Sequence, residues 1–318
     1  MGTFRVLFDE AHGQKHWGET GYGARSRHER FAGLAAMLEH VGAECDSLDR
    51  PLHQVDLREV DALVIPTPTG LYDREEERWR VDSKSLFRPE EIGTALEYVR
   101  SGGILIAFAY RFGDWFTRSN VGKLFLAFGC HLSDDAILPV DQLKEVDPLQ
   151  LSFLATFGEA GGPEFKGQLQ CRPMATFRLL PGSMARPLAY SPGGSCVAFD
   201  RTFRFVSTQC HPVGVGGMEG KGFFLFFGGP HFVEVGEFGL LERPGNGRYI
   251  QSLLNRIRQS MPQKPSGSKR RRNPACTHSR NPTSVDETET DSQEVIGYME
   301  QLLVHRGSLR ALGRWRGG

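Results

Sequence analysis

Paired cysteine motifs, long apolar runs and an excess of one charge are all missing from this sequence. The six cysteines lack CxxC spacing, which argues against a disulfide framework and against a cysteine-rich zinc site. No segment approaches the roughly 18 to 20 consecutive apolar residues of a membrane span. Residues 1–9 lack the pattern of a secretory signal. We therefore expect a globular, cytoplasmic protein with no membrane contact.

Nucleic acid is not an expected partner either. Lysine plus arginine balance aspartate plus glutamate at 38 each, so the net charge gives no support to such a partner. No GxxxxGK[ST] phosphate loop is present, so the letters DEAH at 9–12 are not a helicase signature. The basic run 269–272 precedes an acidic stretch, which is typical of a solubilising spacer.

The first 138 residues alternate between short apolar segments and amphipathic helical patterns. Strands are predicted at 4–8, 44–48, 62–66 and 104–109. Helices are predicted at 26–41, which Gly42 follows as a C-cap glycine, and at 89–100, with Pro89 in the first turn. This alternation is typical of a parallel sheet covered by helices on both faces. The predicted fold class is therefore α/β.

The remaining chain divides into the rest of this domain, a linker and a terminal segment. Residues 151–215 read as a β-rich insertion of antiparallel hairpins, with strands expected at 175–180, 185–190, 196–199 and 203–208. The apolar run 222–227 predicts a return to the main sheet, and an amphipathic helix at 246–260 closes a domain spanning 1–260. Within the first 138 residues, the segment 67–88 between the third predicted strand and the second predicted helix is expected to form a long polar loop.

A charged, disordered linker is predicted at 261–291, because opposite charge blocks there accompany Pro, Ser and Thr. A terminal segment, 292–318, then combines an amphipathic helix with a basic tail. A single tethered helix cannot bury its apolar face alone. We expect residues 292–305 to dock on a protein partner or back on the domain.

Candidate site residues follow the predicted strands. In a parallel sheet, ligands bind beyond the carboxyl ends of the strands. Three segments meet there, namely 9–13, 67–72 and 110–115. The predicted ligand-binding residues are Asp9, Glu10, His12, Gly13, Thr67 and Arg111.

The first of these segments is the most informative, with two carboxylates and an imidazole directly after a strand. These groups could hold a polar ligand or a metal, or perform acid–base chemistry. The alternative is that Asp9 caps the loop and His12 only packs. A metal set of Asp9, Glu10, His12 and His16 would converge only in a helical loop, and Gly13 argues against one. No metal and no cofactor are predicted.

The stretch Val6-Leu7-Phe8-Asp9-Glu10-Ala11-His12-Gly13-Gln14 resembles the opening motif of the DUF4350 family, whose relatives include the GIFT domains. Segments 62–66, 87–92 and 99–103 are similar to later motifs of that family, so the resemblance covers about residues 4–138 and, weakly, 220–258. It implies a flavodoxin-like fold of the class I glutamine-amidotransferase type. It implies no single reaction.

The nucleophile of that enzyme class is missing. Such a thiol sits on a strained strand-to-helix turn. The corresponding turn, 109–113, has no Cys, Ser or Thr at its apex, and neither Cys130 nor Cys196 has that context. His231 and Glu234 resemble the remaining members of a triad but have no nucleophile to act on. We therefore predict a non-catalytic binding or scaffold module with a polar crevice for a small ligand or partner.

One enzymatic alternative stays open. A metal- or water-dependent hydrolase of a nucleotide- or sugar-like substrate would need no side-chain nucleophile. Asp9 or Glu10 would then act as the general base and His12 as the acid or metal ligand, with His231 as a further candidate. Arg111 would hold an anionic substrate.

Overall fold

The structure is a computed structural model that describes residues 4–12, 31–40, 42–73, 78–83, 86–139, 153–157, 168–193, 196–200, 204–207, 209–234, 240–241, 243 and 245–250. Gly13, His16, the predicted linker 261–291 and the predicted helix 292–305 lie outside the described residues. The domain boundary at residue 260 therefore stays a prediction.

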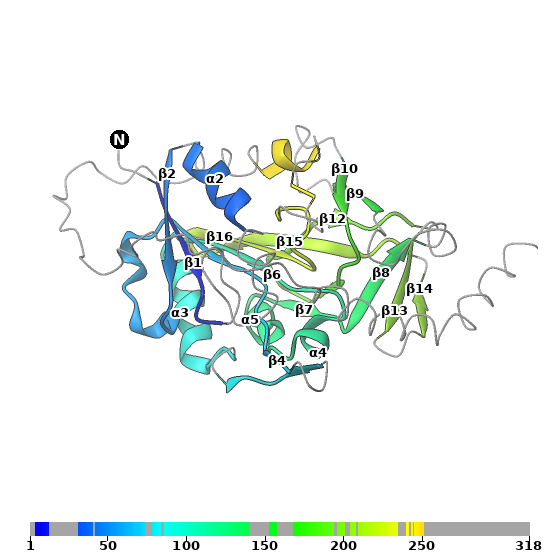
Figure 1. Cartoon of the computed structure of the whole chain (residues 1–318), viewed down its shortest axis with the longest axis horizontal. Coiled ribbons are helices and arrows are strands. Elements are labelled where there is room, and N and C mark those ends of the chain that lie inside the picture. Colours follow the sequence, from blue (N-terminus) through cyan, green and yellow to red (C-terminus); the bar gives the residue numbers. More distant parts are fainter. Residues whose placement is uncertain are drawn as a thin grey trace, which may run out of the picture.

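A nine-stranded sheet forms the centre of the fold (Figure 1). Its strands stand in the order β10-β9-β12-β15-β16-β6-β3-β1-β2. One half of this sheet is parallel and consists of β2 (Ala43–Leu48), β1 (Phe4–Asp9), β3 (Ala62–Ile65), β6 (Ile104–Phe108) and β16 (Gly222–Phe227). The expected strands of the N-terminal half are thus confirmed, as is the return of 222–227 to the main sheet.

The other half of the sheet is antiparallel. It contains β15 (Pro212–Glu219), β12 (Arg186–Tyr190), β9 (Phe153–Phe157) and β10 (Gln168–Cys171). The strand predicted at 185–190 is thus part of the main sheet, which is mixed rather than wholly parallel, and the other three strands of this half were not predicted. The strands predicted at 175–180, 196–199 and 203–208 belong to smaller sheets instead. Because β16 pairs with β6 on one side and with β15 on the other, it is the strand that joins the two halves.

Helices cover both faces of the sheet, as the alternating pattern predicts. On one face, α2 (Ala32–His40) and the helical residues 245–250 pack over the sheet. On the other face lie α3 (Pro89–Arg100) and α5 (Val121–Ala127). Gly42 follows α2 with a φ of 88°, in the left-handed region expected of a C-cap glycine. No helix within the described residues has the length and apolar content needed to cross a membrane.

Strand β16 supplies aromatic side chains to both layers of the core. Phe224 and Phe226 face the layer that contains α5, and Leu225 and Phe227 face the layer that contains α2. Side chains alternate between the two faces of a strand, so a continuous apolar run is buried on both sides only in the interior of a covered sheet. The sequence of β16 therefore fits its central position.

Smaller elements lie around the main sheet. They are the pair β7 (Cys130–Leu132) and β11 (Phe177–Leu179), the three strands β8 (Asp135–Pro139), β13 (Cys196–Asp200) and β14 (Phe205–Ser207), the short helix α4 (Gly113–Thr117), and the 3-10 helices η1 (Leu52–Gln54) and η2 (Leu57–Glu59). The expectation of a long polar loop at 67–88 was wrong in part, because β4 (Leu71–Asp73) and β5 (Arg78–Arg80) form a hairpin there.

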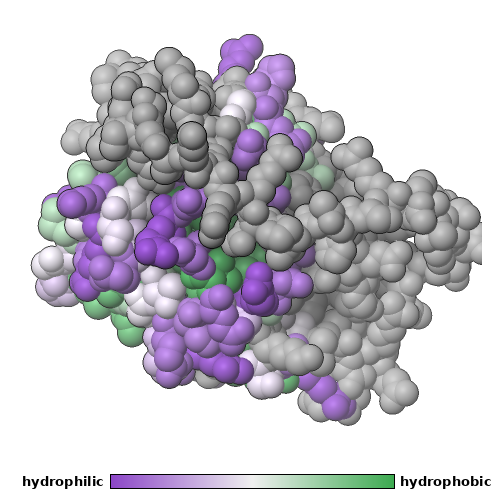
Figure 2. Space-filling view, turned by 90° about the vertical axis from the view of Figure 1, so that its left-hand side faces the viewer, coloured by the Kyte–Doolittle hydropathy of each residue, from purple (hydrophilic) through white to green (hydrophobic). Residues whose placement is uncertain are grey.

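Polar side chains protect the β2 edge of the sheet. Glu44 and Asp46 on this strand are exposed, and the guanidinium of Arg5 on β1 lies 3.7 Å from the Asp46 carboxylate. Figure 2 looks at the side of the molecule that carries β2 and shows a mostly hydrophilic surface with an apolar area near its middle. Charged groups on an edge strand disfavour pairing with a strand of another chain.

A substitution at Gly222 can test how closely the backbone packs at the start of β16. A Cβ atom at this position would lie 2.2 Å from the carbonyl oxygens of both Val99 and Gly103. Backbone atoms cannot move aside as a flexible side chain can, so we expect Gly222→Ala to lower the free energy of unfolding by about 3 kcal/mol. Urea denaturation followed by circular dichroism measures this loss.

Gly93 provides the matched control, because it lies exposed in α3 with nothing within 4 Å of an added Cβ. We expect Gly93→Ala to raise the free energy of unfolding by about 0.5–1 kcal/mol through its better helix propensity. Equal stability of the Gly222→Ala protein and the wild type would contradict the close approach of the backbone at β16.

Candidate functional site

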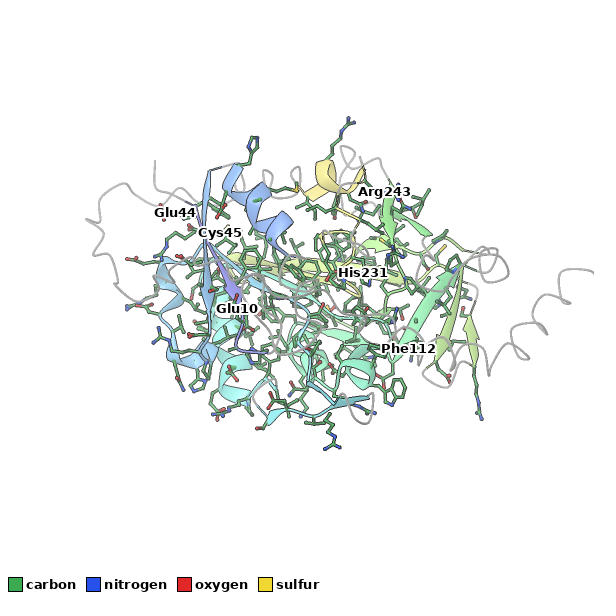
Figure 3. The ribbon with its side chains drawn as sticks, viewed as in Figure 1. Glu10, Glu44, Cys45, Phe112, His231 and Arg243 are labelled. Atoms are coloured by element: carbon green, nitrogen blue, oxygen red, sulfur yellow. The ribbon has the colours of Figure 1, made fainter. Side chains whose placement is uncertain are left out.

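Two groups of polar side chains lie at the carboxyl edge of the parallel strands. The first follows β1 and includes Asp9, Glu10 and His12, and the second follows β6 and β16 and includes Arg111 and His231. Figure 3 shows Glu10 near the end of β1 and His231 well apart from it. The predicted site residues that the structure describes therefore fall into two groups along this edge.

The first group is a closed ion-pair network. His12 Nδ1 lies 2.5 Å from Asp9 Oδ2, and the other carboxylate oxygen of Asp9 accepts a hydrogen bond from the Ala11 N–H at 2.9 Å. The exposed fractions of Asp9 and His12 are only 1% and 2%. A buried charge needs a partner of opposite sign, and here each side chain supplies one for the other.

Glu91 completes this network from the first turn of α3. Its Oε1 lies 3.4 Å from His12 Nε2 and accepts the Leu52 N–H at 3.0 Å, and its Oε2 accepts the Arg88 N–H at 3.1 Å. Phe87 stacks on the imidazole with ring centroids 3.8 Å apart. The sequence reading passed over Glu91; the available signal was an acidic residue at the third position of a helix, which is typical of a capping box.

Two carboxylates keep His12 positively charged. Burial lowers the pKa of the imidazole, but the charges and hydrogen bonds of Asp9 and Glu91 outweigh burial and raise it to about 9. Burial raises the pKa of Glu91, yet the bonds from His12 and from backbone N–H groups lower it to about 2. The triad of Asp9, His12 and Glu91 therefore ties the end of β1 to the start of α3.

The other predicted residues of this edge have different surroundings. Glu10 is half-buried, and its backbone N–H donates to the Leu48 carbonyl at 2.7 Å. The Thr67 hydroxyl is buried and donates to the Ala109 carbonyl at 3.2 Å. This bond joins the segment after β3 to the segment after β6, so Thr67 has a structural partner.

The turn between β6 and α4 has the strained backbone of a nucleophile turn without the nucleophile. Phe112 has a φ of 58° and a ψ of 20°, in the left-handed region that non-glycine residues rarely adopt. Its N–H donates to the Asp135 carbonyl at 2.7 Å, and its side chain is 1% exposed. The residue held in the strained position is therefore a buried hydrocarbon ring.

Cys130 does not supply the missing thiol. It lies in β7, fully buried, and burial raises the pKa of its thiol to about 12. Since the thiolate is the reactive form of cysteine, this side chain is inert at neutral pH. Cys196 lies in β13, in the strand that the sequence predicts for it.

The second group contains a His–Glu pair beside a stacked arginine. His231 Nδ1 lies 2.7 Å from Glu234 Oε2, and the imidazole meets the Tyr110 ring edge to face with centroids 5.4 Å apart. The Arg111 guanidinium stands 5.0 Å from the Tyr110 centroid and 5.2 Å from that of Phe116. Arg111 and His231 were both predicted from the sequence, and the structure brings them into one group.

Arg172 and Arg243 join this group, and sequence reasoning missed both. Arg172 directly follows β10, and its charge interacts with those of Arg111 and Arg243. The Asn246 amide holds the two segments together, because it donates to the carbonyls of Gln170 at 2.9 Å and Leu240 at 3.0 Å and accepts the Gln170 N–H at 3.0 Å. Without β10 in the predicted sheet, nothing in the sequence placed Arg172 at this edge.

Metal ligation has no candidate among the residues that the structure describes. No group of three or more His, Cys, Asp or Glu side chains in that part of the chain has an arrangement that could hold a metal ion. The prediction that the protein binds no metal stays a prediction, because His16 and Gly13 lie outside those residues.

Comparisons with known proteins establish the fold and no more. No protein-family model and no curated protein matches the sequence. The chain is similar to the mmIFT52 N-terminal domain at 14% identity, covering 80% of this chain and 97% of that one with a TM-score of 0.58. It is also similar to the cytoplasmic protein STM1381 from Salmonella typhimurium LT2, at 16% identity, 80% and 99% coverage and a TM-score of 0.49. A ThuA-like protein from Bacteroides uniformis ATCC 8492 matches at 14% identity, 83% and 94% coverage and a TM-score of 0.43. The similarity to the mmIFT52 N-terminal domain identifies the chain as a mixed α/β protein that shares the fold of that domain.

The His12 triad predicts a pH-dependent stability. The folded-state pKa of about 9 lies above the ordinary value of 6.5, so the contribution of protonated His12 is complete below pH 6.5 and is lost as the pH rises through 9. The shift corresponds to about 3 kcal/mol. We expect the wild-type free energy of unfolding to fall by that amount between pH 6 and pH 9.5, as measured by urea denaturation at each pH.

Replacing the imidazole should remove this dependence. His12→Gln leaves two buried carboxylates without their counter-charge, so we expect a loss of about 3–5 kcal/mol at pH 6 and a much flatter profile up to pH 9.5. His53→Gln is the control, because His53 is exposed in η1 and should leave the profile unchanged. If the free energies of unfolding of His12→Gln and wild type changed in parallel with pH, the ion pairs of the triad would make no contribution to stability.

Thiol reactivity checks the burial of Cys130. Because Cys210 is exposed and burial raises the pKa of the Cys130 thiol to about 12, we expect a disulfide reagent at pH 8 to modify Cys210 rapidly and Cys130 only on unfolding. Cys210→Ser should lower the number of fast-reacting thiols by one, and Cys130→Ser should leave that number unchanged. The reverse pattern would place an accessible thiol at β7.

Proposed function

We propose that this protein is a non-catalytic binding module of the DUF4350 and GIFT-like family. Its parallel half would derive from a flavodoxin-like domain of the class I glutamine-amidotransferase type. The motif from Val6 to Gln14 and the fold shared with the mmIFT52 N-terminal domain support this assignment. The binding edge would lie after β6 and β16, around Arg111 and His231.

The conformation of Phe112 is the observation that carries the proposal. Enzymes with a nucleophile elbow hold the reactive side chain on a strained turn between a strand and a helix, exposed beside an oxyanion hole. Here the turn after β6 keeps the left-handed backbone but presents a ring that is 1% exposed. His231 and Glu234 remain paired at 2.7 Å, yet the turn has no cysteine, serine or threonine side chain for them to activate.

The burial of the first group argues against the hydrolase alternative. A general base must reach the water or hydroxyl that it activates. Asp9 and His12 are 1% and 2% exposed, and Glu91 adds a second carboxylate against the imidazole. Glu10 is the one member of the predicted catalytic set among the described residues that keeps partial exposure.

A substrate panel tests the absence of catalysis. We expect the purified full-length protein to release no product from ester, amide, glycoside or nucleotide substrates beyond the level of its His231→Gln and Glu10→Gln variants. His53→Gln serves as the control for general effects of substitution. Turnover that is lost in His231→Gln or Glu10→Gln and retained in His53→Gln would overturn the proposal.

Partner recruitment and location complete the proposal. Residues 292–305 would form the amphipathic helix that binds a protein partner, with Val295, Ile296, Met299, Leu302 and Leu303 on its apolar face. The charged segment 261–291 would act as the tether, and the protein would work in the cytoplasm.

A further inference from the structure

An exposed apolar surface lies where α5 ends and β11 leads into β12. Gly129 connects its parts, because its N–H donates to the Leu126 carbonyl and its own carbonyl accepts the Leu180 N–H, both at 2.9 Å. A Cβ atom on Gly129 would lie 2.4 Å from the Cβ atom of Ser183, which directly precedes Met184. Leu126, Leu180 and Met184 are therefore neighbours, although they come from distant parts of the chain.

The side chains of this surface are open to water. Leu126 is 47% exposed, Leu180 40% and Met184 60%, and Ala127 and Pro181 beside them are exposed too. Three of the seven exposed large apolar side chains among the described residues thus gather in one place. Such a gathering on a protein surface is typical of an interaction site. Together these five residues form what we term the Leu126 surface.

Basic side chains border the Leu126 surface. Lys123 lies in α5, Arg178 in β11 and Arg186 at the start of β12, and all three are exposed. Side chains alternate along an extended segment, so Arg178 and Leu180 lie on the same outer side, opposite the buried Phe177. A segment that docks here should therefore combine an apolar stripe with negative charge.

Residues 286–304 of the same chain have that composition. They contain six aspartate or glutamate residues and no lysine or arginine, and the apolar residues of 292–305 named above follow helical spacing. An amphipathic helix of this length is marginal in water without a surface that covers its apolar face. Charge and apolar pattern in this segment are thus complementary to the Leu126 surface and its basic border.

The intervening chain is long enough for this contact. The 31 residues 261–291 would span roughly 30 Å as a flexible coil and about 100 Å when fully extended. A domain of about 250 residues is about 45 Å across, so residues 292–305 can reach every face of it. A tether of this kind also gives an effective concentration on the order of millimolar, so that even a weak contact is occupied.

We propose that residues 292–305 dock on the Leu126 surface of their own chain. The acidic side chains of 286–300 then face Lys123, Arg178 and Arg186. A protein partner binds the segment only by displacing it from the domain, so the contact limits recruitment to partners that bind more strongly. This inference rests on the proposed recruiting role of the segment and adds its regulation.

Hydrogen exchange of the full-length protein, followed by mass spectrometry, tests the contact. We expect the amides of 292–305 to exchange about tenfold more slowly in the wild type than in Leu180→Gln or Met184→Gln, because the docked segment is protected. Leu303→Gln changes the segment and leaves the domain untouched, and it should remove the protection to the same extent. This variant decides the test if a substitution at Leu180 or Met184 disturbs the fold.

Leu154→Gln is the matched control. Leu154 is 46% exposed on β9, which pairs with the Tyr190 end of β12, whereas Met184 precedes the other end of that strand. We expect this variant to keep the slow exchange of the wild type. Equal exchange of 292–305 in wild type, Leu180→Gln and Leu303→Gln would overturn the contact.

Photocrosslinking distinguishes the same chain from a second copy. With p-benzoylphenylalanine in place of Leu180, we expect a crosslink to residues 292–305 in a species with the mass of one chain. A crosslinked species with the mass of two chains, or no crosslink to this segment, would overturn the proposal. Turnover that is lost in His231→Gln would contradict the non-catalytic function and leave this contact in place, and rapid exchange of 292–305 in the wild type would do the reverse.

Discussion

The parallel alignment of β1, β3, β6 and β16 is the constraint on which the rest of the structure depends. Parallel strands end at the same edge of a sheet, so the segments that follow them must share that edge. Asp9 and His12 after the first strand, Thr67 after the third, and Arg111 and His231 after the two central ones are neighbours of the edge for this reason. Because helices cover both faces of the sheet, its carboxyl edge is the place where polar side chains can gather.

Much of the fold could be predicted from the sequence, because the parallel half obeys simple periodicity. The strand at 222–227 was found from its unbroken apolar run, and the helix at 89–100 from its proline start and apolar spacing. Strand β15 was missed because its glycines look like a turn. In fact a Cβ at Gly214 would lie 3.0 Å from the Phe227 ring, and one at Gly216 would lie 2.7 Å from a backbone oxygen, so these glycines admit close neighbours.

The candidate site was predictable in its location and not in its chemistry. Position after a strand was enough to select Asp9, His12 and Arg111. Whether an imidazole faces solvent or a second carboxylate depends on contacts far apart in the sequence, and Glu91 stands 79 positions after His12. The same holds for Arg172, whose place among other arginines depends on the antiparallel half of the sheet. Strand order, rather than local pattern, decides which charges meet.

The position of β16 also has a consequence for how the protein is made. This strand lies in the middle of the sheet but spans residues 222–227, so a ribosome must release more than two-thirds of the chain before the strand can form. Until then β6 has an open side, and the antiparallel strands made earlier have no connection to it. Nascent chains would therefore expose an unpaired apolar strand during synthesis, a state that chaperones recognise and that favours aggregation when translation stalls.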